Sequence, residues 1–203
     1  MVQKEPARRG RPRAYDPDTA LDQAMALFWS QGYSATSLDA LSAATGMNRP
    51  SLYGAFGDKK ALYLKALALY HGAALAAIDR AFAVPALRDA LGRFFAGALA
   101  LHLSGDKAQR GCLLVGTAAV EAVQDEEIRA VLAGAMADYD ARIEARLRLA
   151  RDRGELSPAA DVAGLARLVS AVLYSSAVRA RAGDSRESLE ATDLLTIDLV
   201  CSQ

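Results

Sequence analysis

The chain has 203 residues, of which 52% are hydrophobic and 24% charged, and its 24 basic and 24 acidic side chains cancel to a net charge of zero. Two cysteines, Cys112 and Cys201, are too few for a disulfide framework and fit a reducing cytoplasm. The absence of an uncharged apolar run of about 18 residues argues against a membrane span, and the basic N-terminus lacks the apolar stretch of a secretory signal.

Helix-period apolar patterns run through most of the sequence, and alternating β-branched runs are lacking, so we predict an all-α protein. The charge is unevenly distributed. Up to Lys65 the chain holds 9 basic and 6 acidic residues, whereas the remainder holds 15 and 18. The basic excess therefore lies in the first third, as binding to a phosphate backbone requires.

Residues 1–14 carry five basic residues and two prolines, a composition that cannot form a core, and we expect this arm to be disordered in the free protein. The run from Arg9 to Pro12 looks like the core of an AT-hook. Arginines in such arms enter narrow minor grooves. Arg9, Arg11 and Arg13 are therefore candidate minor-groove contacts, and a solvated basic tail is the alternative.

A first helix is predicted from Pro17 to about Gln31, because Asp16 can cap it and Gly32 can end it. Its apolar stripe includes Phe28. Trp29 lies beside the stripe, and we expect it to pack where the N-terminal region meets the rest of the protein.

Residues 36–62 read as two short helices joined by a tight turn. Thr36 or Ser37 can cap the first, Gly46 can end it in a left-handed conformation, and Asn48 can cap the second. Leu52 and Phe56 lie one turn apart and should face the core. The residues left facing outward are Arg49, Pro50, Ser51, Tyr53 and Gly54. A short helix with donors on its free face, braced by another helix, suits entry into a DNA major groove.

This segment resembles the DNA-binding domain of the TetR family of bacterial repressors, whose pattern reads T-x-V-x-x-I-A-x-x-A-G-V-S-x-x-x-L-Y-x-x-F-x-x-K-x-x-L. The residues in the same register are Thr36, Leu38, Leu41, Ser42, Thr45, Gly46, Met47, Asn48, Leu52, Tyr53, Phe56, Lys59 and Leu62. Ser42 and Thr45 replace alanines of the pattern. The resemblance implies that Lys59 contacts the DNA backbone. Our full set of candidate DNA contacts is Arg9, Arg11, Arg13, Thr36, Ser37, Asn48, Arg49, Pro50, Ser51, Tyr53, Gly54 and Lys59.

Six further helices are predicted at residues 59–83, 85–103, 111–123, 125–153, 159–182 and 185–200, which makes about nine in all. We divide the chain into a basic arm (1–14), a helix-turn-helix DNA-binding domain (15–62) and a ligand-binding and dimerisation domain (63–203).

The last two predicted helices have apolar faces wider than a narrow stripe, so a buried core pair is one interpretation. The family resemblance implies that they pair with their copies in a four-helix dimer interface. Candidate interface residues are Leu165, Leu168, Val172, Leu189, Leu194 and Ile197. A two-fold dimer would place two recognition helices about 34 Å apart, in successive major grooves of a palindrome.

No nucleotide-binding, nucleophile-elbow, zinc-protease or paired Cys-x-x-Cys motif occurs in the sequence. His71 and His102 fall on different predicted helices. We therefore expect no enzyme, no cofactor and no metal centre.

A signal that releases the protein from DNA would act through a cavity among the fourth to eighth helices. The candidate lining residues are His71, Phe94, Phe95, His102, Cys112, Tyr139 and Tyr174. Cys112 lies at a predicted helix start, where the helix dipole lowers a thiol pKa. The stretch from Arg110 to Val115 looks like one in a branch of the family with electrophile-, oxidant- and copper-responsive members. Three signals stay open, in this order: a hydrophobic small molecule, a redox or electrophile signal at Cys112, and a soft metal ion at Cys112 and His102.

The resulting hypothesis is a cytoplasmic homodimeric transcriptional repressor that binds a palindromic operator and is released by a small-molecule, redox or metal signal; activation instead of repression stays open. The alternatives are a dimeric helical small-molecule-binding protein without a DNA role, and an interaction adaptor.

Overall fold

The computed structural model describes residues 16–105 and 109–203. Over these ranges the chain forms nine α-helices and one π-helical turn without any strand, which confirms the predicted all-α class. In chain order the elements are α1 (Pro17–Gln31), α2 (Leu38–Thr45), α3 (Arg49–Phe56), α4 (Lys59–Phe82), α5 (Leu87–His102), η1 (Leu114–Ala118), α6 (Ala119–Glu121), α7 (Glu126–Asp152), α8 (Val162–Ala182) and α9 (Arg186–Cys201). The predicted basic arm, residues 1–14, lies outside the described residues.

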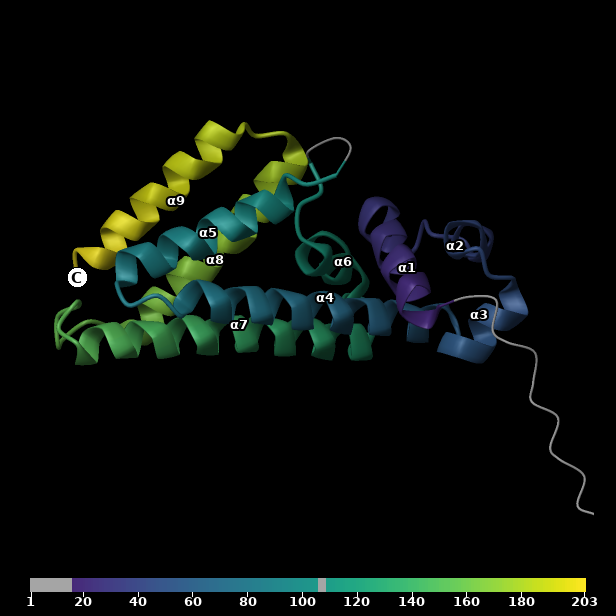
Figure 1. The fold of residues 1–203 in the computed structure, drawn as a ribbon, viewed down its shortest axis with the longest axis horizontal. Coiled ribbons are helices and arrows are strands. Elements are labelled where there is room, and N and C mark those ends of the chain that lie inside the picture. The colour runs from purple at the N-terminus through teal and green to yellow at the C-terminus, as the bar shows by residue number, and fades with distance from the viewer. Residues whose placement is uncertain (1–15, 106–108) are drawn as a thin grey trace, which may run out of the picture.

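Helices α1 to α3 form a small unit at one end of the molecule, which we call the reading head (Figure 1). Each helix begins at a residue whose side chain accepts a backbone N–H. Asp16 caps α1, Ser37 caps α2 through Ala40 N at 3.1 Å, and Asn48 caps α3 through Ser51 N at 2.9 Å. Gly46, with φ of 63°, supplies the left-handed turn between α2 and α3.

A shared apolar core holds the reading head together. Phe28, Leu41, Leu52 and Phe56 are all buried and come from all three helices. Burying one such side chain contributes about 1.5–3 kcal/mol. This core fixes the rotation of α3 about its axis and so decides which of its residues reach the surface.

Helix α4 leaves the reading head and runs on into the rest of the molecule, which we call the body (α5 to α9, with η1). Its 24 residues make it about 36 Å long. Figure 1 shows α4 alongside α7, and the two helices run parallel. The ion pairs between them are Lys60–Glu127 and Asp79–Arg142, and His71 lies close to Asp138 between these pairs.

The body packs α5, α7, α8 and α9 around a second part of the core. Leu67 of α4, Leu91 of α5, Ile143 of α7 and Val169 of α8 are fully buried there. The C-terminus returns to the turn between α7 and α8, where Ser157 N donates to the Gln203 carbonyl at 2.8 Å. The C-terminus and the reading head lie at opposite ends of the molecule (Figure 1).

The predicted continuous helix over residues 111–123 is wrong in detail. The chain forms the π-helical turn η1 and then the single turn α6. Two backbone carbonyls here take side-chain donors: Thr117 Oγ1 donates to Leu113 O at 2.6 Å and Arg181 Nη1 to Gly116 O at 2.8 Å. Side-chain donors inserted into a helix disturb its regular ladder, and such turns occur often at functional sites.

By length and composition alone, α4 and α8 could cross a membrane, although α8 carries arginines in its last turn. Core helices of globular proteins pass the same test. Here both helices contribute buried residues to the common core, including Leu67 and Val169. Packing within the described chain thus accounts for part of these apolar stretches, whereas Leu168 and Val178 of α8 stay exposed.

Candidate nucleic-acid interface, internal cavity and dimer face

The free face of α3 carries the residues that the sequence predicted to face outward. Arg49, Pro50, Tyr53 and Gly54 are exposed, and Tyr53 keeps 47% of its surface accessible. Ser51 is half-buried. A helix of eight residues that presents an arginine, a tyrosine and little bulk between them fits the width of a major groove.

Arg49 does not extend freely into solvent. Its Nε and Nη2 donate to one carboxylate oxygen of Asp39 on α2, at 3.1 and 2.7 Å. The side chains of both residues remain more than half exposed, Arg49 at 54% and Asp39 at 78%. The predicted groove contact is therefore one half of an ion pair at the protein surface.

Lys59, predicted to contact a phosphate, begins α4 beside the reading head. Its ammonium lies 4.4 Å from the centre of the Tyr33 ring, a cation–π contact. Partial burial lowers the pKa of Lys59, and the nearby Glu121 opposes this shift. Tyr33 therefore fixes the position of the cation at the end of α3.

Two of the candidate DNA contacts serve the protein's own backbone. Thr36 is only 1% exposed, and its hydroxyl donates to the Gly32 carbonyl at 2.6 Å. We therefore correct the prediction that Thr36 holds a phosphate: in this structure its side chain braces the turn between α1 and α2. Ser37 and Asn48 are exposed but use their side-chain oxygens as helix caps. Arg9, Arg11 and Arg13 lie outside the described residues.

The body contains a cavity of about 90 Å³ between α4, α5, α7 and α8. Five of the seven predicted lining residues border it: Phe94, His102, Cys112, Tyr139 and Tyr174. Most of the remaining lining is alanine, leucine, isoleucine and glycine. The volume exceeds by several-fold the roughly 10–15 Å³ that a single water needs, so a small organic molecule fits better than one water.

Two polar atoms buried at the cavity residues lack hydrogen-bond partners within the described chain: His102 Nδ1 and Tyr174 Oη. Burial lowers the pKa of His102 to about 4, so its imidazole is neutral at pH 7. Buried polar groups are usually paired. A ligand that offers one or two polar atoms on an apolar body would satisfy these groups.

Cys112 lies at the cavity wall with its thiol buried, and the expectation about its pKa is wrong. The helix dipole predicts a lowered pKa, whereas burial raises the pKa of Cys112. Tyr70 Oη donates to Cys112 Sγ at 3.2 Å and partly offsets this effect. Desolvation dominates because the thiol is almost completely enclosed, so the thiol form prevails at neutral pH.

His71 and Phe95 do not border the cavity, which corrects two of the predicted lining residues. His71 Nε2 instead lies 3.3 Å from Asp138 Oδ2, on the side of α4 that meets α7. Phe95 is buried in the core and packs its edge against Phe94.

A stripe of lining residues on α4 was not predicted from the sequence. The missed residues are Tyr70, Ala74, Ala77, Ile78 and Ala81. Their spacing follows one helix face, so a helical wheel of α4 could have identified the stripe. Its small alanines leave the space that the cavity occupies.

A cluster around Trp29 joins the reading head to the body, as the sequence predicted for this residue. Trp29 Nε1 donates to the Arg110 carbonyl at 3.1 Å, and the Arg110 guanidinium lies 3.9 Å from the centre of the Trp29 ring.

Arg181 of α8 donates both to Trp29 O and to Gly116 O at 2.8 Å. A Cβ at Gly116 would overlap the Arg181 guanidinium, so a larger residue there would displace this side chain from the two carbonyls. Tyr70 stacks edge-on against Trp29 and also contacts Cys112, so the cluster reaches the cavity wall.

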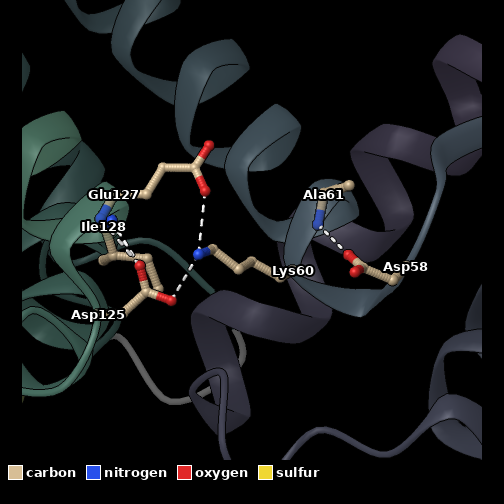
Figure 2. Close-up of polar contacts among 6 residues, drawn as sticks. All are labelled: Asp58, Lys60, Ala61, Asp125, Glu127 and Ile128. Atoms are coloured by element: carbon tan, nitrogen blue, oxygen red, sulfur yellow. Dashed lines mark hydrogen bonds and ion pairs between the residues drawn. The ribbon is translucent and has the colours of Figure 1, made fainter.

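A second junction lies at the start of α4 (Figure 2). Asp58 caps α4 by accepting a hydrogen bond from Ala61 N at 2.7 Å. The side chain of Lys60, in the first turn of α4, extends to the start of α7. Its ammonium lies 2.7 Å from Asp125 and 3.0 Å from Glu127. The hydrogen bond from Lys60 lowers the pKa of Asp125. The charge of Lys60 is therefore already balanced within the protein, unlike that of Lys59.

Helices α8 and α9 present an apolar face that residues 16–105 and 109–203 leave uncovered. Its exposed members are Leu168, Val178, Leu194, Leu195 and Leu199. Leu194 is 61% exposed, whereas Leu189 is 1% exposed and Ile197 is 4% exposed. We therefore correct two predicted interface residues, because Leu189 and Ile197 point into their own protomer. Leu165 and Val172 are half-buried at the edge of this face. Leu195 and Leu199 belong to the apolar surface that the sequence predicted for the last helix, although they are not among the six candidates, and Val178 was not predicted.

Comparisons with known proteins agree with this arrangement. The sequence profile described as "Bacterial regulatory proteins, tetR family" matches residues 20–66, and the profile "Tetracyclin repressor-like, C-terminal domain" matches residues 86–193. The chain is 32% identical over 188 residues to the HTH-type transcriptional repressor ComR of Escherichia coli K12, which covers 89% of this chain and 87% of ComR. It is 41% identical over 73 residues to the HTH-type transcriptional repressor BdcR of the same organism, covering 36% of this chain and 37% of BdcR.

Two similar solved structures contain operator DNA. One of them is a cysteine mutant of the TetR family transcriptional regulator CifR in complex with 26-base-pair double-strand operator DNA. The two chains are 33% identical with a TM-score of 0.76, and the match covers 95% of this chain and 98% of CifR. The likeness extends over both the reading head and the body.

Proposed function

The chain belongs to the TetR family of bacterial regulatory proteins and is a DNA-binding transcriptional regulator rather than an enzyme; from this premise we propose that it acts as a homodimeric repressor on a palindromic operator in the cytoplasm. The relatives named as repressors support repression over activation. CifR, which matches nearly the whole chain, is bound to operator DNA, and this favours a DNA role over a helical small-molecule-binding protein without one.

The observation that carries this proposal is the free face of α3. The cap at Asn48, the turn at Gly46 and the buried Leu52 together turn Arg49 and Tyr53 outward. These are fixed features of the backbone and the core, so the face is already formed without DNA. A preformed recognition helix binds a groove without first losing the conformational entropy of an unfolded segment.

Dimerisation follows from the limited reach of one recognition helix, which covers only a few base pairs. A two-fold dimer places two such helices about 34 Å apart, one turn of the duplex. The exposed face of α8 and α9 supports this part of the proposal, because a second copy of the same face would cover Leu168, Leu194 and Leu195. Uncovered apolar patches on soluble proteins commonly mark such interfaces.

For the signal, the properties of the cavity favour a small, largely apolar molecule with one or two polar atoms. Neutral His102 and the unpaired Tyr174 hydroxyl offer hydrogen bonds, and Arg93 adds a cation to a lining that is otherwise apolar or neutral. The second candidate is an oxidant or electrophile that reacts with Cys112. Its buried, protonated thiol makes this reaction slower than at an exposed thiolate. A soft metal at Cys112 and His102 ranks third, since no group of three or more metal-binding side chains occurs among the described residues.

The route from the cavity to the reading head would be the cluster around Trp29. Tyr70 contacts Cys112 on one side and Trp29 on the other, and Arg181 ties Trp29 to η1. A ligand that stabilises one placement of helix α4 relative to the body would therefore also shift the reading head, which is attached to α4. It could release DNA only by binding the two conformations unequally.

Binding of the purified protein to the DNA upstream of its own coding region tests the DNA role. We expect a sequence-specific complex that contains two protomers and weakens steeply with salt. Analytical ultracentrifugation of the free protein measures the dimer independently. A monomeric protein, or one that binds all duplexes equally, would contradict the proposal.

The three candidate signals can be separated on the preformed complex by fluorescence anisotropy. The complex is titrated with hydrogen peroxide, with copper(I), and with a library of neutral apolar compounds. The Cys112→Ser variant tests the thiol, and Cys201→Ser is the matched control because it removes the other cysteine. Release by peroxide that persists in Cys112→Ser would rule out the thiol signal.

A further inference from the structure

The ion pair between Asp39 and Arg49 joins the two helices of the helix-turn-helix at its exposed surface. Asp39 is the second residue of α2, close to the helix start, where a carboxylate is favourable. Arg49 is the first residue of α3, and the Asn48 cap and Pro50 fix its backbone. Both ends of the contact are thus anchored on rigid elements, and the guanidinium is held in one place before any DNA arrives.

Within the described residues, one edge of the Arg49 guanidinium has no hydrogen-bond partner. A guanidinium has five N–H donors, arranged along a side edge (Nε and Nη2) and an end edge (Nη1 and Nη2). Asp39 Oδ1 accepts from Nε at 3.1 Å and from Nη2 at 2.7 Å, so it occupies the side edge. The end edge keeps its parallel pair of donors. Such a pair matches the N7 and O6 acceptors of guanine in the major groove.

The local charge argues for base reading rather than phosphate attraction at this point. Arg49 is the only cation between residues 36 and 58, and Asp39 balances it. A balanced pair gains little from the phosphate backbone, whose attraction depends on net positive charge. Directional hydrogen bonds to a base edge do not depend on net charge in this way. Lys59, outside this stretch, is better suited to the phosphate role.

We propose that Asp39 is a positioning residue for base recognition: it holds the side edge of Arg49 so that the end edge pairs with one guanine in each half of the operator. This inference rests on the proposed DNA-binding face of α3. Asp39 itself needs no contact with the DNA. Its contribution is to remove the alternative rotamers of Arg49, which would otherwise lower the preference for guanine.

Selection of bound sequences from a pool of random-sequence duplexes tests the proposal. We expect the wild-type protein to enrich a palindrome with a guanine at one position in each half-site, and Arg49→Ala to lose the preference at that position. Asp39→Ala should lower the preference for guanine there by about tenfold and leave the other positions unchanged. Asp22→Ala is the matched control, because it removes an exposed acid of α1 that has no contact with Arg49.

The double variant Asp39→Ala/Arg49→Ala separates positioning from a general effect on folding. If Asp39 acts through Arg49, the double variant and Arg49→Ala have the same base preferences. A base profile of Asp39→Ala identical to that of the wild type would overturn the inference, and so would an equal loss on all sequences. If the wild-type protein enriches no sequence at all, the proposed function itself fails. A selected palindrome that does not depend on Arg49 refutes the role of Asp39 alone.

Discussion

The reading head and the body use polar side chains in opposite ways. In the reading head, Arg49 and Tyr53 stand exposed on a short helix, and their backbone positions follow from adjacent caps and turns. In the body, His102 and Asp193 are buried and each keeps a polar atom without a partner. The polar side chains of the reading head are thus available to an external partner. The buried polar groups of the body lack hydrogen-bond partners and lower the stability of the protein.

This difference teaches where each kind of mutation should act. Changes in the exposed face of the reading head should alter DNA binding and leave folding intact. Changes at the buried polar groups of the body should alter stability and its pH dependence. The apolar face of α8 and α9 belongs to the body but is exposed, so it provides the sharpest test of the comparison.

The largest effect is expected from charge on the dimer face. Leu194→Glu combined with Leu195→Glu places two carboxylates where a second protomer would pack, and should yield a folded monomer. Operator affinity should then fall by about a hundredfold or more, because two linked heads bind far more tightly than one. Analytical ultracentrifugation and anisotropy measure the two effects. Leu149→Glu, at an exposed leucine of α7, is the control. A dimer that survives the double change would place the interface elsewhere.

A buried neutral histidine should make the body sensitive to acid. Burial lowers the pKa of His102 from 6.5 to about 4, so between these values the unfolded chain binds a proton that the folded protein excludes. The contribution of neutral His102 to the free energy of unfolding is fully present above pH 6.5 and is lost as the pH falls towards 4. Relative to His102→Gln, the wild-type protein should lose about 2–3 kcal/mol of unfolding free energy between pH 7 and pH 4.5. Urea unfolding at fixed protein concentration measures this, and parallel pH profiles would contradict it.

Asp193 of α9 should have the opposite pH dependence. Burial, with a smaller effect of Glu190, raises the pKa of Asp193 to about 6. The stability that the neutral form confers is complete below pH 3.8 and is lost as the pH rises through 6. Asp193→Asn should therefore stabilise the protein by about 1–3 kcal/mol at pH 7, and the gain should vanish near pH 4. Asp198→Asn is the control, because this acid of the same helix is exposed and paired with Arg88, so that its substitution should give no gain in stability. A gain independent of pH would point to a cause other than the carboxylate charge.

In the reading head, Arg49→Ala should reduce affinity for the selected operator by about 1–3 kcal/mol, the usual value of one bidentate base contact. The thermal unfolding temperature should stay close to that of the wild type, because Arg49 is exposed. Arg148→Ala, at an exposed arginine of α7, controls for lost charge. An equal loss on unrelated DNA would make Arg49 a phosphate contact.

The smallest effect concerns salt. Lys59→Ala should lower the slope of log affinity against log salt by about one unit per protomer, as expected for one lost phosphate contact. Lys60→Ala is a demanding control, because Asp125 and Glu127 already balance that lysine (Figure 2). It should change the slope much less. Equal changes in the two variants would remove the distinction between these neighbouring lysines.

Local signals were sufficient for the reading head. Caps at Asp16, Ser37 and Asn48 and the left-handed Gly46 act within four residues along the chain. The sequence predicted Asp16, Asn48 and Gly46, and it left the cap of α2 open between Thr36 and Ser37. The assignment of Thr36 to the DNA surface failed for a physical reason. A threonine hydroxyl can bond a phosphate or a nearby carbonyl, and only the packing of α1 against α2 decided for the carbonyl of Gly32.

In the body the sequence determined that the helices exist and that α8 and α9 are apolar on more than one side. It could not say which side meets the protomer's own core, because Leu189, Leu194 and Ile197 are equivalent as hydrophobic residues. The tertiary structure decided this by placing α9 against α5 and α8, which buries Leu189 and Ile197 and leaves Leu194 exposed. The same holds for Cys112: its place at a helix start is a local property, but its pKa depends on how completely neighbouring helices exclude water. Caps and turns arise from contacts between near neighbours in the chain, whereas burial is a property of the assembled bundle.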